Sequence, residues 1–487
     1  MSLSESDCSE RSSSIAPVML FALLLGATSW TSAIDARAIN EKPNNRRTIL
    51  ASYNKERGKI LVGGKVVVRS VPTKDEIRWK RVYTEPELYA TVTGYNSFVY
   101  GNGAGLESAA DPLLSGKADQ LFYGRVTDAL TGKRNRGASL SLTIRPKMQQ
   151  AAREGLGNQK GAVVALDPKT GAILAMYSNP TYDPNTLSTH DLSSAQDAWE
   201  RLTTDADQPM LNRAISRTYP PGSTFKVVTS AAALEGGTYS KDSQIPGPAV
   251  LKLPQTTSTI ANSHPGPCGP SGTVSLLAAL EQSCNTAYGW LGMKIGADGL
   301  RDTAGAFGFG QEMSIPMAVA PSRFPDEVDP PGLAKSAIGQ QDVAATPLEM
   351  AMVAAAVGNK GTVMKPYLVR SVRGSDLSVI DETKPDELGR AMDEGAASQL
   401  GEMMTAVVRS GTGGPAGIPG VSVAGKTGTA QHAPGKPPHA WFIGYAPAED
   451  PKVAVAVVVE SGGNAGSEAY GGTVAGPISK KVMEAAL

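Results

Sequence analysis

A serine and a lysine three residues apart, Ser223 and Lys226, form the most informative chemical pattern in this chain of 487 residues. They follow the run Pro220-Pro221-Gly222, which predicts that a loop ends and a helix begins at Ser223. On a helix, this spacing places both side chains on one face, with Cβ atoms about 5 to 6 Å apart. A lysine activates a serine nucleophile only when it is neutral, so the site must lower the lysine pKa by burial or by a second positive charge.

Two further motifs follow in order, Ser283-Cys284-Asn285 and Lys426-Thr427-Gly428-Thr429-Ala430. Each alone has an ordinary alternative, since the serine and asparagine could cap a turn and the lysine motif could form a hairpin. A second serine-lysine pair, Ser52 and Lys55, lacks a proline-glycine loop before it and is interpreted as a chance match. A second Lys-Thr-Gly, at 169–171, is interpreted as a turn between strands. The ordered set of three motifs is therefore the discriminating feature.

These three motifs resemble those of penicillin-binding proteins and class A β-lactamases. The resemblance extends over most of the chain and is closest to class B penicillin-binding proteins of the actinobacterial penicillin-binding protein A type, which are monofunctional D,D-transpeptidases. Cys284 departs from the Ser-Asp-Asn form of the second motif but leaves both functional side chains in place. Other segments that look like landmarks of this family are 57–60, 105–107, 161–174, 339–341, 346–348 and 439–442.

The resemblance implies a role for each residue of the first two motifs. Ser223 would be the acylated nucleophile, and Lys226 would accept its proton. Ser283 would relay that proton to the leaving amine, while Asn285 would hold the substrate amide and help to position Lys226.

The third motif would bind the substrate. Lys426 would attract the substrate carboxylate and help to keep Lys226 neutral, and the hydroxyl groups of Thr427 and Thr429 would bind that carboxylate. Gly428 would let the substrate pack flat against the strand edge. The backbone N–H groups of Ser223 and Thr429 would form the oxyanion hole.

The function implied by the resemblance is the cross-linking of peptidoglycan stem peptides, in cell-wall synthesis and cell division. The acyl-enzyme would form from D-Ala-D-Ala termini, an amine of an acceptor strand would resolve it, and β-lactams would acylate the same serine. Class A β-lactamases deacylate with a glutamate in an E-x-x-L-N loop, and no such loop lies between Asn285 and Lys426. A D,D-carboxypeptidase and a non-catalytic β-lactam receptor or cell-wall scaffold remain alternatives. Expected protein partners are a membrane glycan polymerase and other cell-wall or division proteins.

Composition excludes other classes. Lys plus Arg and Asp plus Glu each number 46, so no net basic charge favours a nucleic acid. The four histidines show no zinc-ligand spacing, and neither a metal nor a cofactor is expected. His439 near the third motif has no Gly-x-Ser-x-Gly elbow to serve and is interpreted as structural. Cys268 and Cys284 could form a disulfide in an exported protein, although two unpaired buried thiols fit the sequence equally well.

Residues 16–34 form an uncharged run that is just long enough to cross a bilayer. A cleaved signal peptide and an uncleaved anchor both fit, and a buried helix of a soluble protein is a further alternative. Because no good cleavage site follows at once, an anchor is favoured. The resulting expectation is a single-pass membrane protein in which residues 1–35 form a cytoplasmic tail and signal anchor and the catalytic domain is extracytoplasmic.

The rest of the chain predicts an α+β fold in two parts. Residues 36–150 are expected to form an elongated, strand-rich module of the pedestal or dimerisation type, with a hairpin around Gly63-Gly64. The resemblance implies that residues 151–487 form a penicillin-binding transpeptidase domain, an antiparallel five-stranded sheet flanked by helices and similar to serine β-lactamases. Its sheet would open with the paired strands 161–166 and 172–177 and close with the paired strands 440–445 and 452–459.

Overall fold

The computed structural model of residues 1–487 describes residues 19–28, 30, 53–121, 136–374 and 378–487. Its contacts divide the chain into two units, residues 1–55 with 72–79 and residues 56–71 with 80–487. In the first unit, residues 19–28 are helical, and the backbone N–H of Thr73 donates to Arg78 O at 2.9 Å. Within the described ranges, no helix has the length and apolarity needed to cross a bilayer. Most of the expected anchor, residues 1–35, lies outside the described residues.

The second unit is built around a five-stranded sheet in the order β17-β18-β19-β5-β6, in which every neighbouring pair is antiparallel. The strand pairs expected from the sequence are confirmed, and β19 joins the late hairpin to the early one. Almost all residues of these strands are buried, as expected for a sheet covered on both faces. The strands are β17 (Ala424–Ala430), β18 (His439–Ala446), β19 (Val453–Val459), β5 (Gly161–Leu166) and β6 (Ile173–Asn179).

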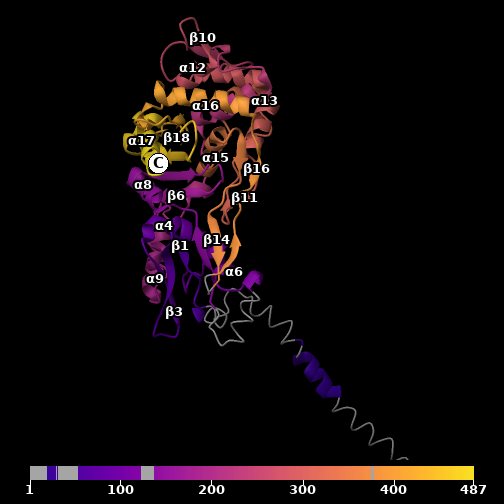
Figure 1. The fold of residues 1–487 in the computed structure, drawn as a ribbon, viewed down its shortest axis with the longest axis vertical. Coiled ribbons are helices and arrows are strands. Elements are labelled where there is room, and N and C mark those ends of the chain that lie inside the picture. The colour runs from indigo at the N-terminus through magenta and orange to yellow at the C-terminus, as the bar shows by residue number, and fades with distance from the viewer. Residues whose placement is uncertain (1–18, 29, 31–52, 122–135, 375–377) are drawn as a thin grey trace, which may run out of the picture. The chain divides into compact units, whose positions relative to one another are not determined.

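Helices cover both faces of this sheet (Figure 1). Helices α8 (Pro146–Leu156) and α17 (Gly471–Glu484) pack on one face and form a separate apolar cluster with it. Helix α15 (Pro347–Gly358) packs on the opposite face, and α16 (Glu394–Arg409) packs beside β17. Helices α12 (Leu276–Glu281) and α13 (Asn285–Phe307) lie at the end of the unit opposite β1 and β14 in Figure 1, and α11 (Lys226–Leu234) packs against α13 and α16. This layered arrangement is the expected sheet flanked by helices.

A second, six-stranded sheet draws its strands from two distant parts of the chain, in the order β15-β14-β4-β1-β2-β3. The expected hairpin around Gly63-Gly64 is confirmed as β1 (Ile60–Val62) and β2 (Lys65–Pro72), and β3 (Trp79–Tyr83) and β4 (Ser139–Leu142) belong to the same sheet. Strands β14 (Val369–Arg373) and β15 (Val379–Glu382) come from more than 200 positions later in the chain. One hydrophobic core therefore runs from Ile60 and Leu140 to Val164 of the five-stranded sheet.

The remaining helices and strands are short or lie at the periphery. The helices are α4 (Pro86–Thr93), α5 (Gly105–Ala109), α6 (Asp111–Leu114), α9 (Leu192–Thr204), α10 (Arg213–Ser216) and α14 (Pro330–Ser336). The short strand pairs are β7 (Gln244–Pro246) with β10 (Thr273–Ser275), β8 (Val250–Lys252) with β9 (Thr259–Ala261), β11 (Met313–Ser314) with β12 (Ala318–Val319), and β13 (Thr362–Met364) with β16 (Glu387–Arg390).

Candidate active site

The segment that carries Ser223 begins as a tight turn rather than as the α-helix expected from the sequence. Residues Gly222–Phe225 form a 3-10 turn, and the α-helix begins at Lys226. Gly222 has φ +54°, a left-handed conformation that glycine adopts without strain and that separates the Ser223 turn from the loop before it. Its N–H donates to Gly339 O at 2.9 Å, and Trp441 Nε1 donates to Pro220 O at 3.1 Å. The nucleophile segment is thus held from both sides.

Lys226 is fully buried at the start of α11 and donates to the second motif. Its Nζ lies 2.8 Å from Ser283 O, 2.8 Å from Asn285 Oδ1 and 3.3 Å from Ser283 Oγ. Burial, with the nearby charge of Lys426 as a second cause, lowers the pKa of Lys226 well below its ordinary value. Within the described residues, no hydrogen bond joins the side chains of Lys226 and Ser223. Such contacts often tighten only when substrate binds.

The second motif lies in the turn between α12 and α13. Ser283 has φ +61°, an uncommon conformation for a residue with a side chain. Cys284 forms a disulfide with Cys268, with an S–S distance of 2.09 Å. Asn285 begins α13, and the side-chain oxygen of Asn262 accepts from its N–H at 3.0 Å. The disulfide and this cap tie the motif to the neighbouring loop.

The third motif lies on β17, the edge strand of the five-stranded sheet. Lys426 is fully buried, and its Nζ donates to Ser283 Oγ at 2.9 Å and to Thr427 O at 2.9 Å. Burial lowers the pKa of Lys426 to about 7. Because β17 is an edge strand, alternate backbone groups point away from β18 and can bind an extended peptide.

A cavity of about 630 Å³ brings these motifs together. Of the residues selected from the sequence, Ser223, Ser283, Asn285, Thr427 and Thr429 line it. The two lysines are fully buried behind its wall, and both contact Ser283 Oγ. Gln340, from the family-landmark segment 339–341, also lines the cavity. Other lining residues that the sequence did not single out include Thr412, Tyr470 and Thr473. They belong to no motif with a chemical signature, so only their spatial position identifies them.

The surroundings of Gly428 differ from the substrate contact expected for it. A Cβ atom at this position would lie 2.9 Å from Pro221 O and 3.0 Å from both Thr224 Cγ2 and Trp441 Cβ. These are atoms of the protein, and Gly428 does not line the cavity. The glycine therefore lets β17 approach the Ser223 turn.

His439 begins β18, and its Nδ1 accepts from the backbone N–H of Ser461 at 3.0 Å. Burial, followed by the neighbouring ring of His432, lowers the pKa of His439 to about 4. These contacts agree with a structural role.

The second Lys-Thr-Gly closes the expected turn between β5 and β6, with the N–H of Gly171 donating to Asp167 O at 2.9 Å. Ser52 of the chance serine-lysine match lies outside the described residues.

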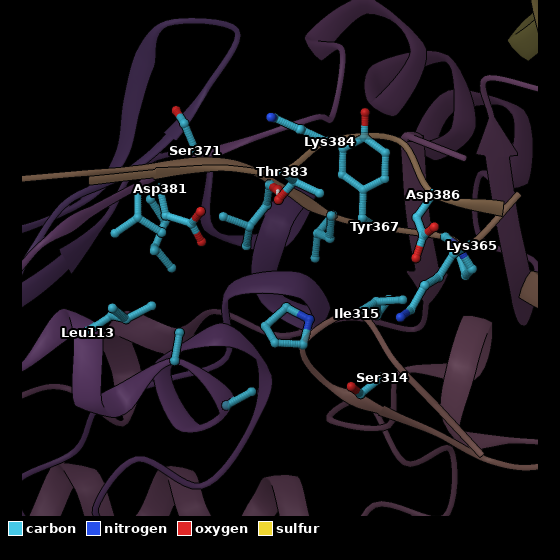
Figure 2. Close-up of a pocket in the computed structure, with 18 residues that line it drawn as sticks. Leu113, Ser314, Ile315, Lys365, Tyr367, Ser371, Asp381, Thr383, Lys384 and Asp386 are labelled. Carbon is cyan, nitrogen blue, oxygen red and sulfur yellow. Dashed lines mark hydrogen bonds between the residues drawn. The ribbon is translucent and has the colours of Figure 1, made fainter. Parts of the chain in front are cut away.

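A second cavity, of about 470 Å³, lies between α6, the β14–β15 strands and the segment 314–316. Leu113 and Ser314 lie on one side of it, opposite Thr383 and Lys384 (Figure 2). None of its lining residues belongs to the three motifs, and the chemistry described above is confined to the first cavity. Over the described ranges, no group of three or more His, Cys, Asp or Glu side chains is placed to hold a metal ion.

A buried lysine one turn after a serine that lines the cavity, a second serine bonded to both lysines and an edge strand beside them define a serine acyl-transfer enzyme. Comparison with known proteins agrees with this class. Residues 161–484 match the penicillin binding protein transpeptidase domain, and residues 57–140 match the penicillin binding protein A dimerisation domain.

Similar proteins cover nearly the whole chain. The sequence is 46% identical over 482 residues to the peptidoglycan D,D-transpeptidase PbpA of Mycolicibacterium smegmatis, covering 97% of each chain. It is 44% identical to PbpA of Mycobacterium tuberculosis, covering 99% of each chain. The solved ceftriaxone acyl-enzyme complex of penicillin-binding protein A from M. tuberculosis superposes with a TM-score of 0.86, covering 90% of this chain and all of that one. The chain belongs to the penicillin-binding protein transpeptidase family.

Proposed function

We propose that this protein is a peptidoglycan D,D-transpeptidase that forms a serine acyl-enzyme from D-Ala-D-Ala stem peptides and is acylated by β-lactams at the same serine. The observation that carries the proposal is the convergence of Lys226 and Lys426 on Ser283, with Asn285 bonded to Lys226, beside the cavity that Ser223 lines. The family match and the names of the similar proteins support the same reaction.

Hydrogen-bond accounting supports Lys226 as the base. A neutral amine has two N–H groups and one lone pair. The two shortest contacts of Lys226 Nζ, at 2.8 Å, are to oxygens that can only accept, the Ser283 carbonyl and Asn285 Oδ1. The orientation of the Asn285 amide is set by its Nδ2, which donates to Ala261 O at 3.1 Å. If Lys226 is neutral, these two bonds use both of its N–H groups, and its lone pair faces the third contact, Ser283 Oγ at 3.3 Å, where it can accept a proton.

In the first half-reaction, Ser223 Oγ attacks the carbonyl carbon of the penultimate D-Ala, and its proton passes to Lys226. The backbone N–H groups of Ser223 and Thr429 stabilise the oxyanion. The C–N bond then breaks, the terminal D-Ala leaves with a proton relayed through Ser283, and an ester remains on Ser223. In the second half-reaction, an amine of the acceptor strand attacks the ester, its proton returns to Ser223, and a peptide cross-link forms.

Substrate binding follows from the third motif. The hydroxyl groups of Thr427 and Thr429 line the cavity and hold the carboxylate of the donor peptide, while Asn285 holds the substrate amide. Lys426 directs Ser283 and supplies positive charge that attracts the carboxylate and disfavours protonation of Lys226.

The proposal extends to the organisation of the chain. Residues 1–35 form a cytoplasmic tail and signal anchor, 36–150 a non-catalytic module of the pedestal or dimerisation type, and 151–487 the transpeptidase domain. The uncharged run at 16–34 supports a single-pass membrane protein with an extracytoplasmic catalytic domain. The proposed partners of the protein are a membrane glycan polymerase and other proteins of cell-wall synthesis or division.

Labelling with a fluorescent penicillin tests the proposal. Ser223→Ala is expected to abolish covalent labelling and turnover of a D-Ala-D-Ala peptide without changing the circular dichroism spectrum, whereas Ser52→Ala is expected to retain both. Mass spectrometry of the labelled chain should place the adduct on the peptide that contains Ser223, and the labelled protein should fractionate with membranes. Intact labelling of Ser223→Ala would refute the site assignment, and labelling without peptide turnover would favour a receptor.

A further inference from the structure

The segment Ser410-Gly411-Thr412-Gly413 follows α16 and bridges two motifs of the candidate site without belonging to either. On one side it is fixed to the end of α12, two residues before Ser283. Ser410 Oγ donates to Glu281 Oε1 at 2.6 Å, and the N–H of Thr412 donates to Glu281 O at 3.3 Å. A Cβ atom at Gly411 would lie 2.5 Å from Glu281 O, so only glycine allows this approach.

On its other side the segment meets β17 and α17. Thr412 Oγ1 lies 2.8 Å from Thr427 Oγ1. A Cβ atom at Gly472 would lie 2.3 Å from Thr412 O, so the backbone of Thr412 is also fixed against the start of α17. Thr427 is only 6% exposed, whereas Thr412 is exposed at the rim, and both residues line the cavity.

The hydrogen atoms of this pair can be counted. Each hydroxyl has one hydrogen to donate and two lone pairs. Lys426 Nζ lies 3.4 Å from Thr427 Oγ1. When this amine is charged it has no lone pair, so it can act only as a donor to Thr427. The bond between the two threonines uses one hydroxyl hydrogen, which leaves one for the cavity. If Thr412 donates, the O–H of the buried Thr427 stays free to donate to a ligand.

Thr429 provides a second donor on the same strand. Its Oγ1 accepts from the N–H of Gly471 at 3.4 Å, so its own hydrogen remains available. A carboxylate, which only accepts, matches two hydroxyl donors on one strand.

We infer that Thr412 is a positioning residue for the carboxylate of the donor peptide: its hydroxyl donates to Thr427 and thereby directs the O–H of Thr427 into the cavity. This inference rests on the proposed function and deepens its substrate-binding step. Thr412 acts through Thr427, so its removal weakens recognition of the carboxylate rather than the chemistry at Ser223.

The test uses Thr412→Val in the full chain, a change that removes the hydroxyl and keeps the shape of the side chain. The KM for a D-Ala-D-Ala stem peptide is expected to rise about tenfold, as for loss of one hydrogen bond to a charged group, while kcat changes little. Thr412→Ser should restore the wild-type KM. Thr405→Val is the matched control, because the Thr405 hydroxyl donates to Gly401 O at 2.8 Å within α16 and does not line the cavity.

A comparison of penicillin G with its methyl ester separates carboxylate recognition from general loosening of the site. Thr412→Val should reduce the preference for the free acid over the ester about tenfold. In a Thr427→Val background, the same substitution should cause no further reduction, because Thr412 acts through Thr427. An unchanged acid-to-ester ratio, or additive effects of the two substitutions, would overturn the inference. Ser223→Ala is assayed in parallel. If Ser223→Ala loses labelling but the acid-to-ester ratio of Thr412→Val is unchanged, the inference about Thr412 is refuted while the proposed function stands.

Discussion

The six-stranded sheet and the catalytic cavity both enclose charged side chains, but they balance those charges in opposite ways. Beside the sheet, the fully buried Glu107 accepts from Arg81 Nε at 2.5 Å and from Arg57 Nη2 at 2.9 Å. Burial alone would raise the pKa of Glu107, but the guanidinium groups of Arg81 and Arg57 hold this pKa below its ordinary value. Arg57 also pairs with Asp111 at 2.6 Å. Each buried charge there has a partner of opposite sign.

At the catalytic cavity, two buried lysines share the hydroxyl of Ser283, and every hydrogen bond of their amines goes to a neutral oxygen. Two ammonium groups without a carboxylate are costly in a buried site, so at least one amine loses its proton. Paired charges thus fix a structure, whereas unbalanced charges of one sign create a base. Only the second cluster contributes residues to the wall of the cavity.

The largest effect is expected at the catalytic cluster. Lys226→Ala should slow acylation of Ser223 by roughly four orders of magnitude, because removing one member of a nucleophile-base unit costs nearly as much as removing the unit. Stopped-flow acylation by a fluorescent penicillin measures the rate. Lys294→Ala, on the exposed surface of α13, should keep the wild-type rate. Equal rates for the two variants would mean that the buried amine is not the base.

The next effect is expected at the paired cluster and falls on stability. Glu107→Ala leaves two guanidinium groups without their shared partner and should lower the free energy of unfolding by about 3 to 5 kcal/mol. Urea denaturation measures this change, and the folded fraction should acylate at the wild-type rate. Glu87→Ala is the control, because its pair with Arg153 is solvent-exposed and should contribute little. If both variants unfold at the same urea concentration, the buried cluster does not stabilise the sheet as described.

A smaller effect is expected at Glu349, a buried carboxyl in α15 that belongs to neither cluster. Within the described residues neither of its carboxylate oxygens has a hydrogen-bond partner, and burial raises its pKa to about 8. The folded protein then holds a proton that the unfolded chain releases above about pH 4.5, so the free energy of unfolding falls as pH rises from about 4.5 to 8.

Glu349→Gln removes this titration, so its stability relative to wild type should increase over that pH interval and level off above it. Urea denaturation between pH 5 and 9 gives the difference at each pH. Glu200→Gln, on the exposed face of α9, should show no such trend. A constant difference between wild type and Glu349→Gln would show that the carboxyl is ionised throughout.

The sequence by itself determined the local strands and turns of this protein and the side chains available for its chemistry. Continuous apolar runs predicted four strands of the five-stranded sheet, and glycine and proline marked the turns within each pair, because these signals are local in the chain. The order of the serine-lysine, serine-asparagine and lysine-threonine-glycine motifs predicted one acyl-transfer site, and the structure brings Lys226, Ser283, Asn285 and Lys426 into direct contact.

Only the tertiary structure decided which distant segments meet. It places β14 and β15 in the same sheet as β1, pairs Arg57 with Glu107, and packs the backbone of Gly428 against Pro221. It also brings Thr412 to 2.8 Å from Thr427, a contact that no local pattern indicates. Such contacts depend on strand register and helix packing across hundreds of residues, and the free energy that selects them comes from burial of the whole core rather than from the residues themselves.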